Sequence, residues 1–193
     1  MAEAGPPNYP WYGSVEGENL EQGDILLDCP RFIIPQQALD EPQQSPDNPR
    51  QHPVQIETVD AIILTQSCDL AIRENGQCEA ADAILCELFF KKKLTEHTKF
   101  KKDDTWDEVR KGKYSFFHLL HQCTLPELPL DFMLVDFHKV FTLGVDLVRQ
   151  FAKKKGKRPR LLPPYREHMS QAFARLFMRV GLPADIPPFS GKK

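Results

Sequence analysis

The feature that most constrains this chain is a short apolar run, Val59 to Leu64, which stops abruptly at polar residues. A nearly continuous run of this length favours a strand buried on both faces, because a helix needs about ten residues or more. Before it, residues 30–54 carry repeated prolines among polar residues, and such a segment suits neither a helix nor a paired strand. The sequence therefore predicts a core strand between a long Pro-rich surface loop and a polar turn.

Other apolar runs predict further strands and helices. Strands are expected at residues 25–27, 83–90, 114–120 and 131–137, and helices at residues 103–109, 143–155 and 164–180. The last helix is the clearest, because its apolar residues recur at i, i+3, i+4 and i+7 along one stripe. This stripe contains Met169, Ala172, Phe173, Leu176, Phe177 and Val180, with Gly181 as the expected cap. About five short strands and this C-terminal amphipathic helix predict an α+β fold built on a small β-barrel.

The length of 193 residues fits one domain. We expect residues 20–182 to form it, residues 1–19 to be an irregular N-terminal arm and residues 183–193 to be a C-terminal tail. No apolar stretch approaches the roughly 18 residues of a membrane span, and the first residues lack the order of a signal peptide. These features predict a cytoplasmic protein whose five cysteines are reduced thiols.

The charges are divided unevenly along the chain. Residues 1–90 carry 3 basic and 16 acidic side chains, whereas residues 91–193 carry 22 basic and 11 acidic ones. Two explanations remain open at this point. Either the two halves attract each other within the fold, or a basic surface faces a polyanion while an acidic surface faces something else.

Polar side chains of several kinds follow the core strand. Thr65, Ser67 and Asp69 are candidate catalytic residues, because the end of a buried strand would hold them rigidly. Cys68 is a poor nucleophile, since the neighbouring carboxylate of Asp69 would raise its pKa. In the alternative interpretation, Ser67 and Asp69 cap a turn through hydrogen bonds to the backbone, and Cys68 packs inward.

A basic run near the C-terminus is a candidate nucleic-acid-binding segment. It consists of Lys153, Lys154, Lys155, Lys157, Arg158 and Arg160. No aromatic residue interrupts the run to stack on bases, so a solvated linker is the competing interpretation.

Metal binding is not expected. His118, His121 and Cys123 lie close in sequence, but structural zinc sites usually combine two close pairs of ligands, and the chain contains no CxxC. The histidines are therefore expected to be ordinary, partly buried side chains, and no cofactor is predicted.

Four motifs follow one another along the chain: GDILLDCP, VDAIILTQSCDL, AILCELFF and FMLVDFHKVFTL. Their order resembles the PemK/MazF-like family of bacterial toxins, over roughly residues 22–147. It implies an SH3-like β-barrel and an endoribonuclease that cleaves mRNA, free or on the ribosome, without a metal. It also implies a homodimer and a protein antitoxin. Similar barrels occur in phage-defence assemblies, and TQSCDL with the C-terminal PPYREHMSQAFARLFMRVGLP also resembles an uncharacterised bacterial group.

The chain departs from the family at one functional position. An Arg-Pro pair usually begins the second strand of these toxins, whereas Asp60-Ala61 lies near that place here. The resemblance then implies that Thr65 or Ser67 supplies the hydroxyl and that Arg73, Lys91 or the basic run supplies the cation. The alternative is a non-catalytic module that binds a protein partner on the same barrel.

Overall fold

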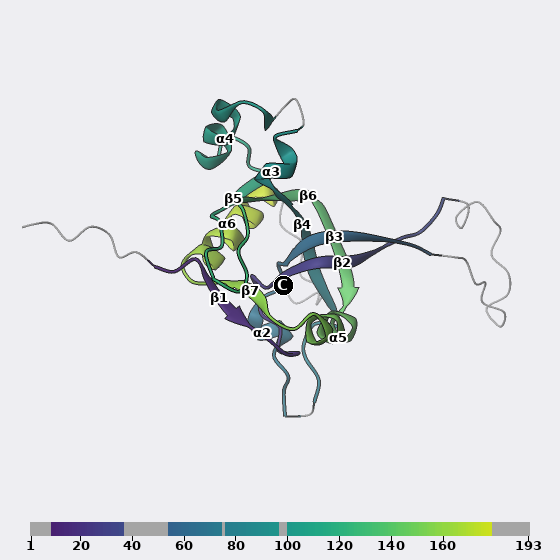
Figure 1. The fold of residues 1–193 in the computed structure, drawn as a ribbon. Coiled ribbons are helices and arrows are strands. Elements are labelled where there is room, and N and C mark those ends of the chain that lie inside the picture. The colour runs from purple at the N-terminus through teal and green to yellow at the C-terminus, as the bar shows by residue number, and fades with distance from the viewer. Residues whose placement is uncertain (1–8, 37–53, 75, 97–99, 179–193) are drawn as a thin grey trace, which may run out of the picture.

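The computed structural model describes residues 9–36, 54–74, 76–96 and 100–178, which form an α+β fold. Its centre is a five-stranded antiparallel sheet with the strand order β2-β3-β4-β6-β5 (Figure 1). These strands are β2 (Ile25–Ile33), β3 (Gln55–Ile63), β4 (Asp82–Phe90), β6 (Met133–Gly144) and β5 (Phe117–Leu120). The sheet is open, with β2 and β5 at its two edges. The predicted core strand, β3, lies between β2 and β4, as its apolar composition requires.

Two short strands form a second sheet that the sequence did not predict. β1 (Tyr12–Val15) pairs antiparallel with β7 (Arg158–Leu161). The expectation of an irregular arm over residues 1–19 is therefore wrong for β1, and the basic run is no linker where it forms β7. Neither strand shows the apolar run by which the sequence predicts strands. β1 contains few apolar residues besides Tyr12, and β7 buries the charged Arg158, which an ion pair to Asp24 stabilises.

β2 extends past its predicted end into the Pro-rich loop, and β3 begins before its predicted start. β2 continues to Ile33 because it pairs with β3 as far as the Ile33–Gln55 position, so the predicted loop 30–54 is shorter. Pro30 is tolerated because β2 is an edge strand, where a missing N–H costs no inner ladder bond. Together β2 and β3 project from the sheet as a two-stranded ribbon (Figure 1). Residues 37–53 of the expected loop lie outside the described residues.

Three predicted helices are confirmed and two short ones are new. The helices are α2 (Ser67–Leu70), α3 (Lys91–Leu94), α4 (Asp103–Arg110), α5 (Val145–Lys155) and α6 (Tyr165–Phe177). The predicted helices correspond to α4, α5 and α6. On α6, Met169 is fully buried, but Phe177 is 66% exposed, so its assignment to the buried stripe is wrong. Val180 and Gly181 lie outside the described residues.

The helices pack their apolar sides on the sheet and its surroundings. Met169 of α6 joins the largest buried cluster, Val148 of α5 joins a second, and Trp106 of α4 joins a third. All five cysteines are free thiols. Among the described helices, none combines the length and the apolar character needed to cross a membrane.

Ion pairs join the acidic N-terminal half to the basic C-terminal half. They include Lys93–Asp60, Lys139–Glu87, Lys153–Glu18, Lys155–Asp28, Arg158–Asp24 and Arg160–Glu21. Arg158 also donates to the backbone carbonyl oxygens of Gly17 and Asn19. The first explanation of the uneven charge is therefore confirmed for these residues: the two halves attract each other within the fold.

Candidate functional site

The polar turn after β3 is held by its own hydroxyl groups. Thr65 is buried, and its Oγ1 accepts a hydrogen bond from the backbone N–H of Ile84 at 2.6 Å. Ser67 Oγ accepts one from the backbone N–H of Gln22 at 3.2 Å. Both hydroxyls thus connect the turn to neighbouring segments, which is a structural use of these side chains.

The other candidates in this turn lie around the short helix α2. The carbonyl oxygen of Asp69 accepts from the N–H of Ala80 at 3.0 Å, and Arg73 forms an exposed ion pair with Glu79. Cys68 is exposed, so the expectation that it packs inward is wrong. Leu70, which is 2% exposed, fills the inward position of α2 instead. The structure brings Thr65, Ser67 and Asp69 into one turn and places Arg73 beyond it.

The basic run is divided between buried and exposed positions. The guanidinium groups of Arg158 and Arg160 both bind Asp24, and Arg158 is only 3% exposed. Lys153, Lys155 and Lys157 are exposed and pair with Glu18, Asp28 and Glu127, whereas Lys154 is exposed without an ion pair to any described residue. Only the lysines therefore present their charge to solvent.

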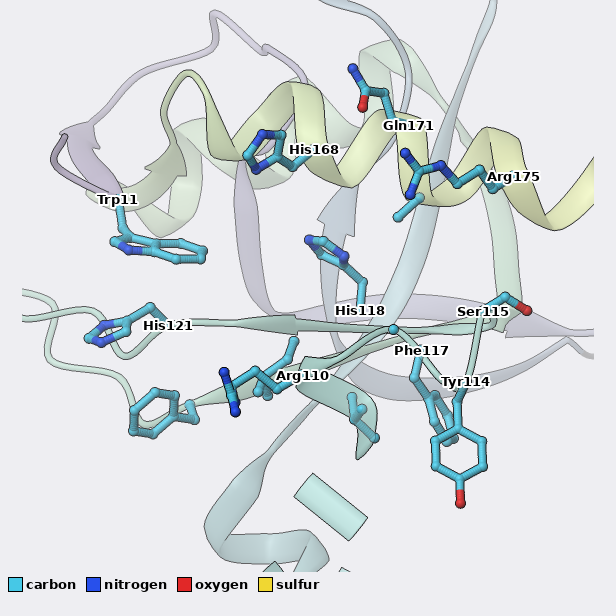
Figure 2. A pocket seen from close by; sticks show the side chains of 15 residues that line it. Trp11, Arg110, Tyr114, Ser115, Phe117, His118, His121, His168, Gln171 and Arg175 are labelled. Carbon is cyan, nitrogen blue, oxygen red and sulfur yellow. The ribbon is translucent and has the colours of Figure 1, made fainter. Parts of the chain in front are cut away.

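A cavity of about 600 Å³ lies where α6 passes the edge strand β5, and Figure 2 shows its lining. Three imidazoles and two guanidinium groups line it, and none of the described lining residues carries a carboxylate. The imidazoles belong to His118, His121 and His168, and the guanidinium groups to Arg110 and Arg175. This combination of cationic and titratable groups makes the cavity the candidate functional site.

Two elements position the polar groups of the cavity. His118 lies on β5, opposite Val135 of β6, and points toward α6 (Figure 2). His168, Gln171 and Arg175 follow one another on α6 at i, i+3 and i+7, so they share one side of the helix. That side lies next to the apolar stripe that anchors α6 through Met169. The packing of the helix therefore sets the direction of its polar row.

Stacked aromatic rings form one end of the cavity. The ring of Trp11 lies on that of Tyr165, with centroids 3.6 Å apart and planes 8° apart. On its other side Trp11 stacks with His121 at 5.5 Å, and His121 meets Phe132 edge-on at 5.0 Å. Tyr12 fixes this end by donating its hydroxyl to the carbonyl oxygen of His121 at 2.6 Å.

Electrostatics distinguish the histidines of the cavity. Burial and, to a smaller extent, the nearby His168 together lower the pKa of His118 to about 4. His118 is therefore neutral at neutral pH, while His168 is exposed on α6. Arg110 pairs with Asp107 at 3.1 Å, whereas Arg175 has no ion pair with any residue that the structure describes. The cavity thus holds a free guanidinium group beside a neutral imidazole.

Sequence reasoning missed most of this site. The sequence predicts His118 and His121 to be ordinary, partly buried side chains, whereas His118 is partly buried, His121 is exposed, and both line the cavity. Within the described residues, no three His, Cys, Asp or Glu side chains are grouped to hold a metal ion. The signal that identifies His168 and Arg175 is their i, i+7 spacing beside an apolar stripe. Trp11 had no such signal, because its place depends on pairing between β1 and β7.

Comparisons of the chain with protein-family models, with curated proteins and with solved structures found no match. The function of the cavity must therefore be argued from its own chemistry.

Proposed function

We propose that this chain binds and cleaves RNA without a metal ion, as a PemK/MazF-like effector of a bacterial stress or defence system. The observation that carries the proposal is the cavity, in which guanidinium and imidazole groups lie beside stacked aromatic rings, with no carboxylate among the described lining residues. Guanidinium groups bind phosphate oxygens through charge-assisted hydrogen bonds, and aromatic rings stack on unpaired bases. A single-stranded RNA offers both partners in one ligand.

The SH3-like barrel of that family belongs to this proposal. In support of it, the β1–β7 sheet meets the start of β2 through a bridge between Asp24 and Arg160. We infer that this small sheet closes the side that the five-stranded sheet leaves open. Asp24 then reinforces the closure through its ion pairs with Arg158 and Arg160.

The exposed lysines of the basic run are proposed as further contacts to the RNA backbone. Lys153, Lys155 and Lys157 can exchange their exposed carboxylate partners for phosphates at little cost, because exposed ion pairs contribute less than about 1 kcal/mol. Lys154 is exposed and has no ion pair with a described residue to give up. Arg158 and Arg160 remain in the fold. In this proposal Thr65, Ser67 and Asp69 support the turn rather than react, because both hydroxyls already accept backbone hydrogen bonds.

The test is incubation of the purified protein with end-labelled single-stranded RNA, with and without ribosomes and with EDTA present. We expect cleavage that survives chelation. The double variant Arg110→Gln, Arg175→Gln should bind RNA at least about tenfold more weakly, because both phosphate-binding groups are lost. Lys101→Gln with Lys102→Gln, two exposed cations outside the cavity lining, is the matched control and should bind like the wild type. Intact RNA under all conditions, or cleavage that requires a metal, would overturn the proposal.

A second candidate is a non-catalytic module that binds a protein partner, such as an antitoxin, a regulator or a second copy. The observation in its favour is the apolar face of the β2–β3 ribbon. Phe32 and Ile56 are register partners, 44% and 62% exposed, and Ile34 and Val54 beside them are 67% and 49% exposed. Such a cluster of exposed large apolar residues is typical of interaction surfaces.

RNA cleavage and partner capture distinguish the two candidates. If the module binds a protein and does not cleave, excess protein leaves RNA intact, and Phe32→Ser with Ile56→Ser abolishes association with the partner. Ile72→Ser changes an equally exposed apolar residue outside the ribbon and should leave association unchanged. Cleaved RNA together with undisturbed association in the ribbon variant would exclude this candidate.

A further inference from the structure

We propose that His118 and His168 form the general base and general acid of RNA cleavage in the cavity, with Arg175 binding the phosphate. This inference rests on the proposed RNA cleavage and assigns its chemistry to a site away from the polar turn after β3. Two imidazoles and the Arg175 guanidinium group line this one cavity.

The geometry places the two imidazoles on different walls. His118 rises from β5 toward α6, and His168 lies on α6 itself (Figure 2). Arg175 follows His168 by seven residues, about 10 Å along the helix axis, so both face the same ligand-sized space. The aromatic end with Trp11 lies on the His121 side and bounds the same space.

The surroundings of the two histidines assign their roles. His118 is neutral because it is buried and close to His168, so it is ready to accept a proton. His168 is exposed on the helix, in contact with the solvent that supplies and removes protons. A buried imidazole and an exposed one on different walls of one cavity are arranged as an acid–base pair requires.

The reaction is a transesterification that balances within the substrate and the two histidines. A ring nitrogen of His118 takes the proton of the ribose 2′-OH while the 2′-oxygen attacks phosphorus. The bond between phosphorus and the 5′-oxygen breaks, and protonated His168 gives its proton to that oxygen. The products are a 2′,3′-cyclic phosphate and a 5′-hydroxyl, and solvent returns both histidines to their starting states. The Arg175 guanidinium binds the charge that develops on the non-bridging oxygens.

The experiment compares His118→Asn and His168→Asn with His138→Asn, an exposed histidine outside the cavity lining. We expect each cavity variant to lose about 10²- to 10⁴-fold in the cleavage rate while still binding RNA, and the control to lose nothing. A substrate with sulfur in place of the bridging 5′-oxygen has a leaving group that needs no proton. It should restore cleavage by His168→Asn but not by His118→Asn.

The outcomes separate this inference from the function on which it rests. If the wild-type protein leaves RNA intact, the proposed function fails. If it cleaves and both histidine variants cleave equally well, the function stands and the inference fails. Products with a 3′-hydroxyl, or a His168→Asn variant that the sulfur substrate does not rescue, also overturn the inference. Circular dichroism establishes that the variants are folded, and should His118→Asn unfold, the His168→Asn comparison still decides the matter.

Discussion

Asp24 and Arg158 form a buried ion pair across 134 positions of the sequence, with Nε and Oδ2 2.9 Å apart. Their side chains are 0% and 3% exposed. Arg160 binds the same carboxylate, so one buried anion holds two cations of the basic run. The pair thus connects the residue just before β2 to the start of β7, and it gives the basic run a structural role.

Replacing Asp24 with Asn should destabilise the protein strongly. It leaves the buried guanidinium group of Arg158 without an anionic partner, and breaking such a pair costs about 3 to 5 kcal/mol. Lys153→Ala removes the exposed pair with Glu18 and should cost less than about 1 kcal/mol. Urea denaturation of both variants checks this, and equal losses would show that burial does not control the strength of these pairs.

Stability should depend on pH through His118. Its pKa is lowered to about 4 by burial and by His168, so the unfolded chain takes up a proton before the folded one as the pH falls. The contribution of neutral His118 is complete above about pH 6.5 and is lost toward pH 4, by up to about 2 kcal/mol between pH 7 and pH 5. His118→Asn should reduce this decline and His138→Asn should not, as measured by urea denaturation at both pH values. If His118→Asn loses as much stability between pH 7 and pH 5 as the wild type, groups other than His118 cause the pH dependence.

Two substitutions on α6, Phe173→Asp and Phe177→Asp, test how this helix packs. Phe173 packs against the main core, with its ring centroid 5.3 Å from that of Phe137, whereas Phe177 is 66% exposed. Phe173→Asp should therefore cost at least about 3 kcal/mol or prevent folding, because it places a charge without a partner in an apolar contact. Phe177→Asp should stay within about 1 kcal/mol of the wild type. A cooperative, unshifted thermal transition of Phe173→Asp would contradict this packing.

The stability of the turn after β3 should depend on Thr65 and not on Cys68. Thr65→Val keeps the shape but removes the acceptor for the Ile84 N–H, at a cost of about 1 to 2 kcal/mol. Cys68→Ala changes an exposed side chain and should alter the free energy of unfolding by less than about 0.5 kcal/mol, with no loss of RNA cleavage. Thermal unfolding and a cleavage assay check both. Loss of cleavage in Cys68→Ala at full stability would establish a role for the thiol.

The salt dependence of RNA binding tests the proposed role of the lysines in the basic run. Replacing Lys153, Lys154, Lys155 and Lys157 with Gln should flatten the dependence of log binding constant on log salt concentration by roughly 3 units, if each contacts a phosphate of single-stranded RNA. The measurement is RNA binding at several salt concentrations, and replacing Lys101 and Lys102 provides the comparison. An unchanged slope in the fourfold variant would show that these lysines do not contact the RNA.

The sequence predicted the elements that have strong periodic patterns. The apolar run before Thr65 and the stripe through Met169 led correctly to β3 and α6, because burial of one face or both dictates such patterns. β1 and β7 escaped prediction because a long-range partner stabilises each strand. Ion pairs to Asp24 satisfy a buried arginine in β7, which no local apolar pattern reveals.

The candidate site was less predictable than the fold. The sequence indicates Thr65 and Ser67 as site residues because they follow a buried strand. In the structure both hydroxyls accept backbone hydrogen bonds, which is a structural role. The cavity joins His118 with Trp11 and Arg175, which lie 107 positions before it and 57 after it. Such a combination depends on how α6 crosses β5, and sequence spacing alone does not specify this crossing.

The β1–β7 pairing also has a consequence for synthesis on the ribosome. Tyr12 pairs with Leu161, and Trp11 stacks on Tyr165, so Trp11 and Tyr12 must wait for the synthesis of about 150 further residues before they reach their native partners. Contacts of such long sequence separation form late and slowly. A nascent chain that ends before α6 therefore has neither helix wall nor aromatic end for the cavity. Products that terminate before α6 should carry no activity of this site, and the site becomes competent only after α6 has been synthesised.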